Sequence, residues 1–302
     1  KDFFCFIGMI FKKNSKKKGK MDMKKWNKVI QFGLLGAALV GLAACGNEAT
    51  DAEGSSAEGL EVINIAATST PHAEILEQVK EDLKEKGFEL EVTILDDYPL
   101  YNPALDAGDV DANFFQHTPY LDSYKEETGS EITPVAKIHF EPLGIYAGKT
   151  KDLADIKEGA QISIPNDATN GGRALLLLEA NGLIELKEGL GITATVSDIT
   201  KNEKDLKIVE LAAEQVARSV QDVDFAVVNA NYALEAGFDV QNDALASEAI
   251  DSEAAEIYGN VLVVRKEDVE ADKVKALIEV LKTDKVRDFI NDTYNGAVVP
   301  LF

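Results

Sequence analysis

The chain has 302 residues, and its 53 acidic residues against 31 basic ones give a formal net charge of −22 at pH 7. Residues 46–302 alone carry 51 acidic and 21 basic side chains, a balance of −30, which argues against nucleic acid or anionic lipid head groups as partners. The length allows one large domain or two lobes. The two cysteines are Cys5 and Cys45, so no disulfide is expected beyond residue 45.

Residues 21–45 have the order of a secretory signal peptide. Lysines up to Lys28 precede an apolar run over 29–44, which ends in Leu42-Ala43-Ala44-Cys45. These four residues resemble the lipobox of bacterial lipoproteins, which would place a diacylglyceryl thioether, with acyl chains such as palmitate, on Cys45. The alternative is a transmembrane anchor, but sixteen residues fall short of the ~20 that a spanning helix needs. We therefore expect a protein tethered to the outer face of the cell membrane.

The segments on either side of this signal are not expected to fold. Residues 1–20 end in a stretch rich in Lys and Gly just before a Met. Translation of a purine-rich ribosome-binding site would give such a stretch. We therefore expect an over-extended reading frame whose true start is Met21 or Met23. Residues 21–44 are then the signal peptide. Residues 45–59 form the lipidated cysteine and a polar, flexible tether.

From residue 60 onward, strand and helix patterns alternate. The first set predicts strands at 61–66, 89–95 and 112–115, with helices at 71–87, 102–108 and 118–127. The second set predicts strands at 161–165, 207–211, 224–229 and 260–265, with helices at 172–180, 214–221, 269–282 and 283–291. This alternation favours an α/β fold with a largely parallel sheet.

Two such sets behind a tether suggest two lobes with a ligand between them, beyond the carboxyl ends of the strands. We expect the chain to cross between the lobes at β segments 143–148 and 260–265. Lobe 1 would then contain residues 60–150 and 256–302, and lobe 2 residues 151–255. One continuous domain remains an alternative.

Arg173 is a candidate anion-binding residue. It follows a strand end and a Gly-containing loop, and a helix that begins at 172 would place it in the first turn, where a cation opposes the helix dipole. Such a position suggests a carboxylate partner, which could be a ligand or an internal salt bridge.

Aromatic residues near strand ends are candidates for a pocket wall, although ordinary core packing would also explain them. The three histidines lack the spacing of a metal site, and no nucleophile elbow is present. We therefore expect no enzymatic activity, no metal and no cofactor.

Three sequence blocks together, at 111–121, 165–178 and 226–233, resemble the methionine-binding lipoprotein family, the extracytoplasmic receptors of methionine ABC importers. The resemblance implies a two-lobed periplasmic-binding-protein (type II) fold that encloses an amino acid between its lobes. It implies capture of methionine and its delivery to an importer permease with its ATPase, by a monomeric lipoprotein that binds no nucleic acid.

The family pattern places an aromatic wall for the thioether side chain at Tyr98 and Phe115. His117 follows in the same block and would line the pocket. A polarizable sulfur packs favourably against aromatic rings.

The family pattern also places the polar contacts. Arg173 matches the arginine that pairs with the ligand carboxylate, and Asn229 and Asn260 match ligand-binding asparagines. The match at Asn260 departs from the family pattern, because Gly259 stands before it where the family has Val. Asn231 lies close enough to Asn229 in the sequence to be the ligand-binding asparagine instead. The partner of the ligand amine and the preference for D- or L-methionine stay open.

Three other functions are compatible with the sequence. The receptor could bind a methionine derivative or a short methionine-containing peptide. The chain could be a surface adhesion or structural lipoprotein with a vestigial cleft. It could also be a hydrolase on the same scaffold.

Overall fold

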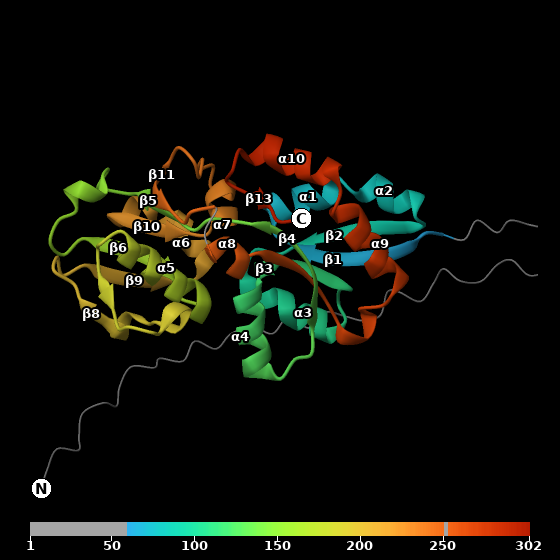
Figure 1. The fold of residues 1–302 in the computed structure, drawn as a ribbon, viewed down its shortest axis with the longest axis horizontal. Helices are drawn as coiled ribbons and strands as arrows, with labels where there is room; N and C mark the ends of the chain where they lie inside the picture. The colour runs from blue at the N-terminus through green and yellow to red at the C-terminus, as the bar shows by residue number, and fades with distance from the viewer. Residues whose placement is uncertain (1–58, 251–252) are drawn as a thin grey trace, which may run out of the picture. The chain divides into compact units, whose positions relative to one another are not determined.

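Residues 59–250 and 253–302 are described by the computed structural model, and they belong to one unit, residues 57–302. The expected signal peptide, Cys45 and nearly all of the tether lie outside the described residues. Within them, strands and helices alternate as the sequence pattern predicts, in two main sheets (Figure 1).

The first sheet has the strand order β13-β4-β12-β3-β1-β2. Its members are β1 (Glu61–Ala67), β2 (Phe88–Ile94), β3 (Ala112–His117), β4 (Thr133–Phe140), β12 (Asn260–Val264) and β13 (Val299–Pro300). The second sheet has the order β11-β5-β10-β6-β9. It comprises β5 (Gly144–Ala147), β6 (Gln161–Pro165), β9 (Lys207–Leu211), β10 (Phe225–Val228) and β11 (Ala244–Ser247), and a separate small ribbon pairs β7 (Glu185–Leu186) with β8 (Ile199–Lys201).

The helices connect and cover these strands. They are α1 (Glu74–Glu77), α2 (Lys80–Glu85), α3 (Tyr101–Ala107), α4 (Thr118–Thr128), α5 (Ala168–Ala180), α6 (Ala213–Ser219), α7 (Ala230–Glu235), α8 (Glu253–Ile257), α9 (Asp272–Leu281) and α10 (Asp284–Tyr294). The helix expected at 71–87 is present but interrupted: a π-helical turn at 69–73 leads into α1, and Gln78 and Val79 separate α1 from α2.

Both sheets are mixed, so the prediction of largely parallel pairing is also wrong. β1 pairs parallel with β2 and β3, and β6 pairs parallel with β9 and β10. The strands that lie beside the passages between the sheets run antiparallel to their neighbours, namely β12 in the first sheet and β5 and β11 in the second. The sequence pattern identifies strands but carries no signal for the direction of these returning segments.

The chain passes between the two sheets twice, and so forms a two-lobed α/β fold. It leaves the first sheet after β4 and enters the second at β5, and it returns between β11 and β12. The passages therefore lie at 141–143 and 248–259, beside the β segments at which we expected them rather than within those segments. β5, which the expected boundary at residue 150 would assign to lobe 1, is a strand of the second sheet.

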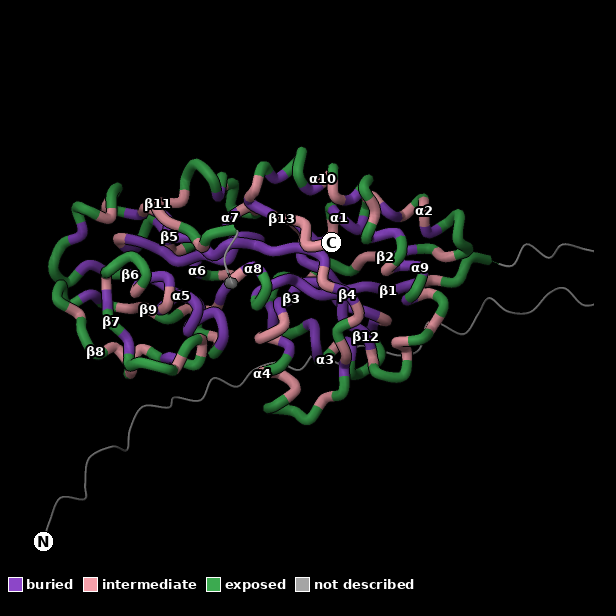
Figure 2. The backbone as a smooth tube through the Cα atoms, in the orientation of Figure 1, coloured by how far each residue is buried: buried purple, intermediate pink, exposed green. Residues whose placement is uncertain are grey.

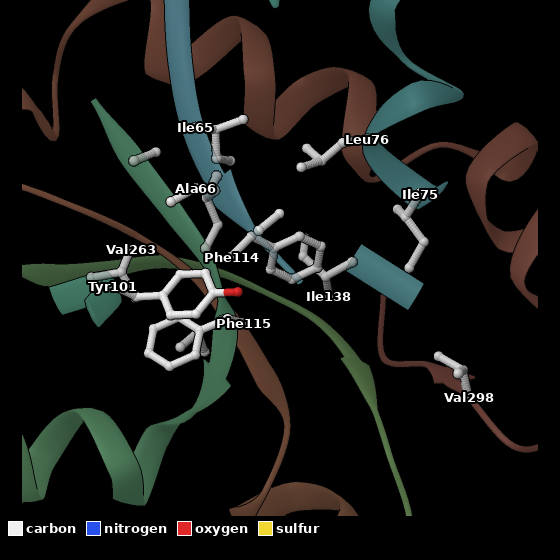
Figure 3. Close-up of a cluster of buried hydrophobic side chains, with 14 of the residues drawn as sticks. Ile65, Ala66, Ile75, Leu76, Tyr101, Phe114, Phe115, Ile138, Val263 and Val298 are labelled. Atoms are coloured by element: carbon white, nitrogen blue, oxygen red, sulfur yellow. The ribbon is translucent and has the colours of Figure 1, made fainter. Parts of the chain in front are cut away.

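Buried residues concentrate along the strands (Figure 2). In the first lobe, Ile65 and Phe114 from neighbouring strands meet Leu76 from α1, and all three side chains are fully buried (Figure 3). In the second lobe, Ile162 and Phe225 form a separate core with apolar residues of α5. At roughly 1.5–3 kcal/mol for each buried large apolar side chain, these cores can hold the strand ends in place around a site.

Candidate functional site

A cavity lies where segments of the two lobes meet. The six residues that the sequence analysis selects all line it, and its full lining consists of Tyr98, Phe115, Gln116, His117, Tyr120, Glu141, Asn170, Arg173, Asn229, Ala230, Asn231 and Asn260. The first lobe contributes residues of β3, α4 and β12, whereas the second contributes residues of α5 and α7. The structure therefore brings together residues that are up to 162 positions apart, from Tyr98 to Asn260.

The end of β3 supplies two of these side chains to the same face. Phe115 and His117 are two positions apart on the strand, so both point to the cavity, while Phe114, which precedes Phe115, points into the core (Figure 3). His117 also begins α4: its Nδ1 accepts a hydrogen bond from the backbone N–H of Tyr120 at 3.2 Å. This bond fixes the ring, whose Nε2–H then donates to Asn170 Oδ1 at 3.0 Å.

Aromatic rings form one wall of the cavity. The ring of Tyr98 lies with its centroid 5.8 Å from Phe115 and 5.9 Å from Tyr120. Tyr101 stacks behind Phe115 at 4.0 Å and supports it (Figure 3). The Tyr98 hydroxyl donates to Asn231 Oδ1 at 2.6 Å, which ties this wall to the opposite lobe. The result is a buried apolar surface of fixed shape.

Arg173 is buried at the polar side of the cavity, where its contacts are largely internal. Its Nε and Nη2 donate to the two carboxylate oxygens of Glu248 at 2.7 and 2.5 Å, and Nη2 also donates to the Glu141 carbonyl at 2.8 Å. The ring of Tyr258 stacks against the guanidinium at 4.3 Å. Within the described chain no hydrogen bond engages Nη1, which leaves this nitrogen for a ligand.

The position of Arg173 in its helix differs from the prediction. α5 begins at Ala168 rather than at 172, because the Asp167 side chain accepts the backbone N–H of Asn170 and caps the helix there. Arg173 therefore lies in the second turn, and the argument from an unfavourable helix dipole fails. The internal salt bridge that the sequence left open as an alternative is present, with Glu248 as the partner.

The asparagines leave two buried polar atoms without protein partners in the described chain. Asn229 Nδ2 donates to Asn170 Oδ1 at 3.0 Å, but Asn229 Oδ1 accepts no hydrogen bond. Asn231 Oδ1 accepts from Tyr98, while Asn231 Nδ2 has no acceptor. Since buried polar groups in proteins are nearly always paired, one free acceptor and one free donor beside the same cavity indicate a polar ligand.

Glu141 is the one carboxylate in the cavity lining. It is buried, and its burial raises the pKa of its carboxyl above the ordinary value. Its Oε1 accepts a hydrogen bond from His139 Nε2 at 2.7 Å and lies 3.4 Å from His72 Nε2. Together, these three side chains have the types and spacing that could hold a metal ion, with ligand atoms within 4.8 Å of one another.

Six cavity residues were not selected from the sequence. Glu141 has no local signal, because it follows β4, a strand that the pattern did not predict. The other five stand inside the three blocks on which the family resemblance rests, so those blocks contained the signal: they are Gln116, Tyr120, Asn170, Ala230 and Asn231.

This protein has two lobes and, between them, a cavity lined by polar and aromatic side chains. Such an arrangement is typical of proteins that enclose a small molecule between their lobes. Comparison with known proteins identifies the group within this class. Residues 63–302 match the model of the NlpA lipoprotein family, and the chain belongs to this family.

Named relatives and solved structures agree with this assignment. The methionine-binding lipoprotein MetQ of Bacillus subtilis (strain 168) is 40% identical over 264 residues, which cover 86% of this chain and 93% of that protein. A crystal structure from Ruminococcus gnavus is 50% identical with a TM-score of 0.79 and covers 80% of this chain and 100% of its own. A nutrient-binding protein from Burkholderia cenocepacia, solved bound to methionine, is 40% identical with a TM-score of 0.76 over 80% of this chain and 100% of its own.

Among the helices of residues 59–250 and 253–302, none is both long and apolar enough to cross a bilayer.

Proposed function

We propose that this chain is the extracytoplasmic receptor of a methionine ABC importer. The observation that carries the proposal is the convergence of Tyr98, Phe115, His117, Arg173, Asn229 and Asn260 on one cavity. The family membership and the methionine-bound relative support the same ligand.

The ligand carboxylate is proposed to bind at Arg173. The Nη1 group of this arginine is available beside the cavity, and Glu248 and Tyr258 hold the guanidinium in place. The free Nδ2 of Asn231 is a second donor for the same carboxylate. Charge-assisted hydrogen bonds of this kind are the strong ones in a buried site.

The ligand ammonium is proposed to bind at Glu141, a partner that the sequence did not reveal. The carboxylate of Glu141 lines the cavity, and the free Oδ1 of Asn229 offers a neutral acceptor nearby. A buried ammonium without such acceptors would be strongly destabilised, since it loses its hydration on binding.

The thioether side chain is proposed to lie against Tyr98, Phe115 and Tyr120. Sulfur near the edge of an aromatic ring gains about 0.3–1.5 kcal/mol over ordinary contact. The same contacts would also suit a methionine derivative such as the sulfoxide.

Catalysis finds no support in the cavity. Its lining, as described, includes no Ser, Thr, Cys or Lys that could act as a nucleophile. The proposed role is therefore binding alone, with ATP hydrolysis on the importer's own subunits.

Occupancy is proposed to be signalled by closure of the lobes. Two hydrogen bonds cross the cavity between them, from Tyr98 to Asn231 and from His117 to Asn170. A monomer with both lobes closed over methionine would be the form that the permease recognises.

We also propose that Cys45 carries the lipid anchor, on the strength of the lipobox resemblance and the family to which the chain belongs. Cells expressing the full chain should incorporate labelled fatty acid into it, and Cys45→Ala should abolish the label. Label retained in Cys45→Ala would refute the anchor without bearing on the ligand.

The ligand itself is tested by native mass spectrometry of residues 46–302 after gentle purification. A bound species heavier by one methionine supports the proposal, and a different added mass changes the substrate. An empty protein that neither methionine nor its relatives stabilise against heat would refute the receptor function and favour an adhesion or structural role.

A further inference from the structure

Two of the three histidines have no place in the site as proposed so far. His72, in the turn after β1, and His139, near the end of β4, are almost completely buried. Neither lines the cavity, yet both reach Glu141, which does. This contact suggests that they act on the ligand through Glu141.

The two rings engage one side of the Glu141 carboxylate. His139 Nε2 donates to Oε1 at 2.7 Å, and His72 Nε2 lies 3.4 Å from the same oxygen. The backbone N–H of Asn231 also binds this carboxylate. The carboxylate cannot turn away from the cavity without breaking the short bond to His139.

His72 holds a second cavity residue at the same time. Its Nε2 lies 3.1 Å from Asn260 Oδ1, so the amide oxygen of Asn260 is the natural acceptor of the Nε2–H proton. At the other side of the ring, Nδ1 lies 2.7 Å from the hydroxyl of Thr68, which fixes the ring orientation. His72 thus sets the orientation of the Asn260 amide and lies beside Glu141.

We propose that His72 and His139 are positioning residues of the ammonium site, which hold the Glu141 carboxylate and the Asn260 amide toward the ligand amine. This inference rests on the proposed function, because it requires a ligand with an ammonium group.

Neutral histidines suit this role better than cations. Burial lowers the pKa of His72 to about 4 and that of His139 to about 3, so both rings donate hydrogen bonds at pH 7 without carrying charge. The negative charge of Glu141 then remains for the ammonium. A Lys or Arg in either place would form an ion pair with Glu141 and compete with the ligand.

The test is a double-mutant cycle in methionine binding, measured by calorimetry at pH 7 with His139→Phe, Glu141→Gln and the double variant. His139→Phe keeps the ring volume beside Phe114 but loses the donor. We expect it to weaken binding by about 10- to 100-fold, the loss typical of a hydrogen bond to a charged group. In the Glu141→Gln background the same change should cost less than about 3-fold, because its partner charge is gone.

Rescue separates positioning from a merely structural role. His139→Gln retains a side-chain N–H donor, and we expect its methionine affinity to lie within about 5-fold of the wild type. Equal losses in His139→Gln and His139→Phe, or a His139→Phe loss of the same size in both backgrounds, would overturn the inference.

Wild-type protein provides an independent measurement if the Phe variant does not fold. Nitrogen-15 NMR of the imidazoles at pH 7 should show two neutral rings protonated at Nε2, with the His72 and His139 signals shifting when methionine binds. A charged ring, or a metal ion retained on the purified protein and bound to these nitrogens, would contradict neutral donors. A wild type that binds no methionine at all would instead refute the proposed function.

Discussion

Replacement of Arg173 by Met is the most direct test of carboxylate recognition, but the structure shows that it has two effects. Arg173 donates twice to Glu248 and once to the Glu141 carbonyl, and it would also bind the ligand. Glu248 is only about 10% exposed, so Arg173→Met leaves a nearly buried carboxylate without its cation. A loss of binding in this variant alone would therefore not distinguish a damaged fold from a lost ligand contact.

The magnitudes of the two effects can be separated. Removing one partner of a buried ion pair typically costs about 3–5 kcal/mol of stability, and we expect the lower end because Glu248 keeps its bond from the Leu143 N–H. The double variant Arg173→Met/Glu248→Gln removes the stranded charge and should recover most of that stability. The loss of the ligand ion pair should remain, at roughly 2–5 kcal/mol, or about 30- to 5,000-fold in Kd.

The assay measures two quantities on four proteins: the wild type, both single variants and the double variant. Chemical denaturation gives the free energy of unfolding, and calorimetric titration with methionine gives Kd. We expect the double variant to unfold nearly as the wild type does but to bind methionine at least about 30-fold more weakly. A double variant that is folded and binds within about 3-fold of the wild type would refute the assignment of Arg173 to the ligand carboxylate.

Three further predictions follow from particular contacts. Tyr98→Ala should weaken methionine binding more than alanine binding in parallel titrations, because only the longer side chain reaches the aromatic wall; equal losses would argue against that wall. The folded state keeps its three histidines neutral, with pKa values of about 4 for His72 and about 3 for the other two, whereas the unfolded chain protonates them near 6.5. The free energy of unfolding should therefore fall as the pH drops below 6.5, by about 2 kcal/mol for each histidine at pH 5. The buried Glu141 opposes this loss in part, because its raised pKa favours proton uptake by the folded state. Denaturation at pH 7 and pH 5 measures this, and unchanged stability would contradict it. Gly172→Ala would place a Cβ 1.9 Å from the Ile192 carbonyl oxygen and should cost at least about 2 kcal/mol, whereas Gly59→Ala, which meets nothing within 4 Å, should be silent in the same unfolding assay.

Local sequence pattern predicted the regular parts of the fold. The strands at 61–66, 161–165, 207–211 and 260–265 appear within a residue or two, because each is a short run rich in the β-branched residues Val and Ile. The pattern missed β4, α7 and β11. The two strands among them are fixed by pairing with strands distant in sequence, β4 with β12 and β11 with β5.

The residues of the site also fall into two groups, those predicted from the sequence and those that only the structure reveals. The residues assigned from the family resemblance all reach the cavity, because such a resemblance transfers long-range geometry that local sequence pattern does not contain. The residues that escaped prediction contribute through tertiary contact: Glu248 pairs with Arg173 from 75 positions away, and His72 reaches Asn260 across 188 positions. Neither pairing can be recognised from the spacing or the periodicity of residues in the sequence.

These hidden partners determine how the site would discriminate. Arg173 is already paired with Glu248, whereas Glu141 is held only by a neutral His139, so the one uncompensated charge of the cavity lining is the negative charge that an ammonium would bind. A zwitterion adds one charge of each sign and satisfies the free atoms of Asn229 and Asn231. A ligand without its amine or carboxylate would leave one of these buried atoms unpaired, a defect that sites of this kind reject strongly. The aromatic wall, in contrast, distinguishes side chains only by packing, at about 1–3 kcal/mol per methylene. The cavity should therefore separate amino acids from other molecules more sharply than it separates methionine from amino acids of similar shape.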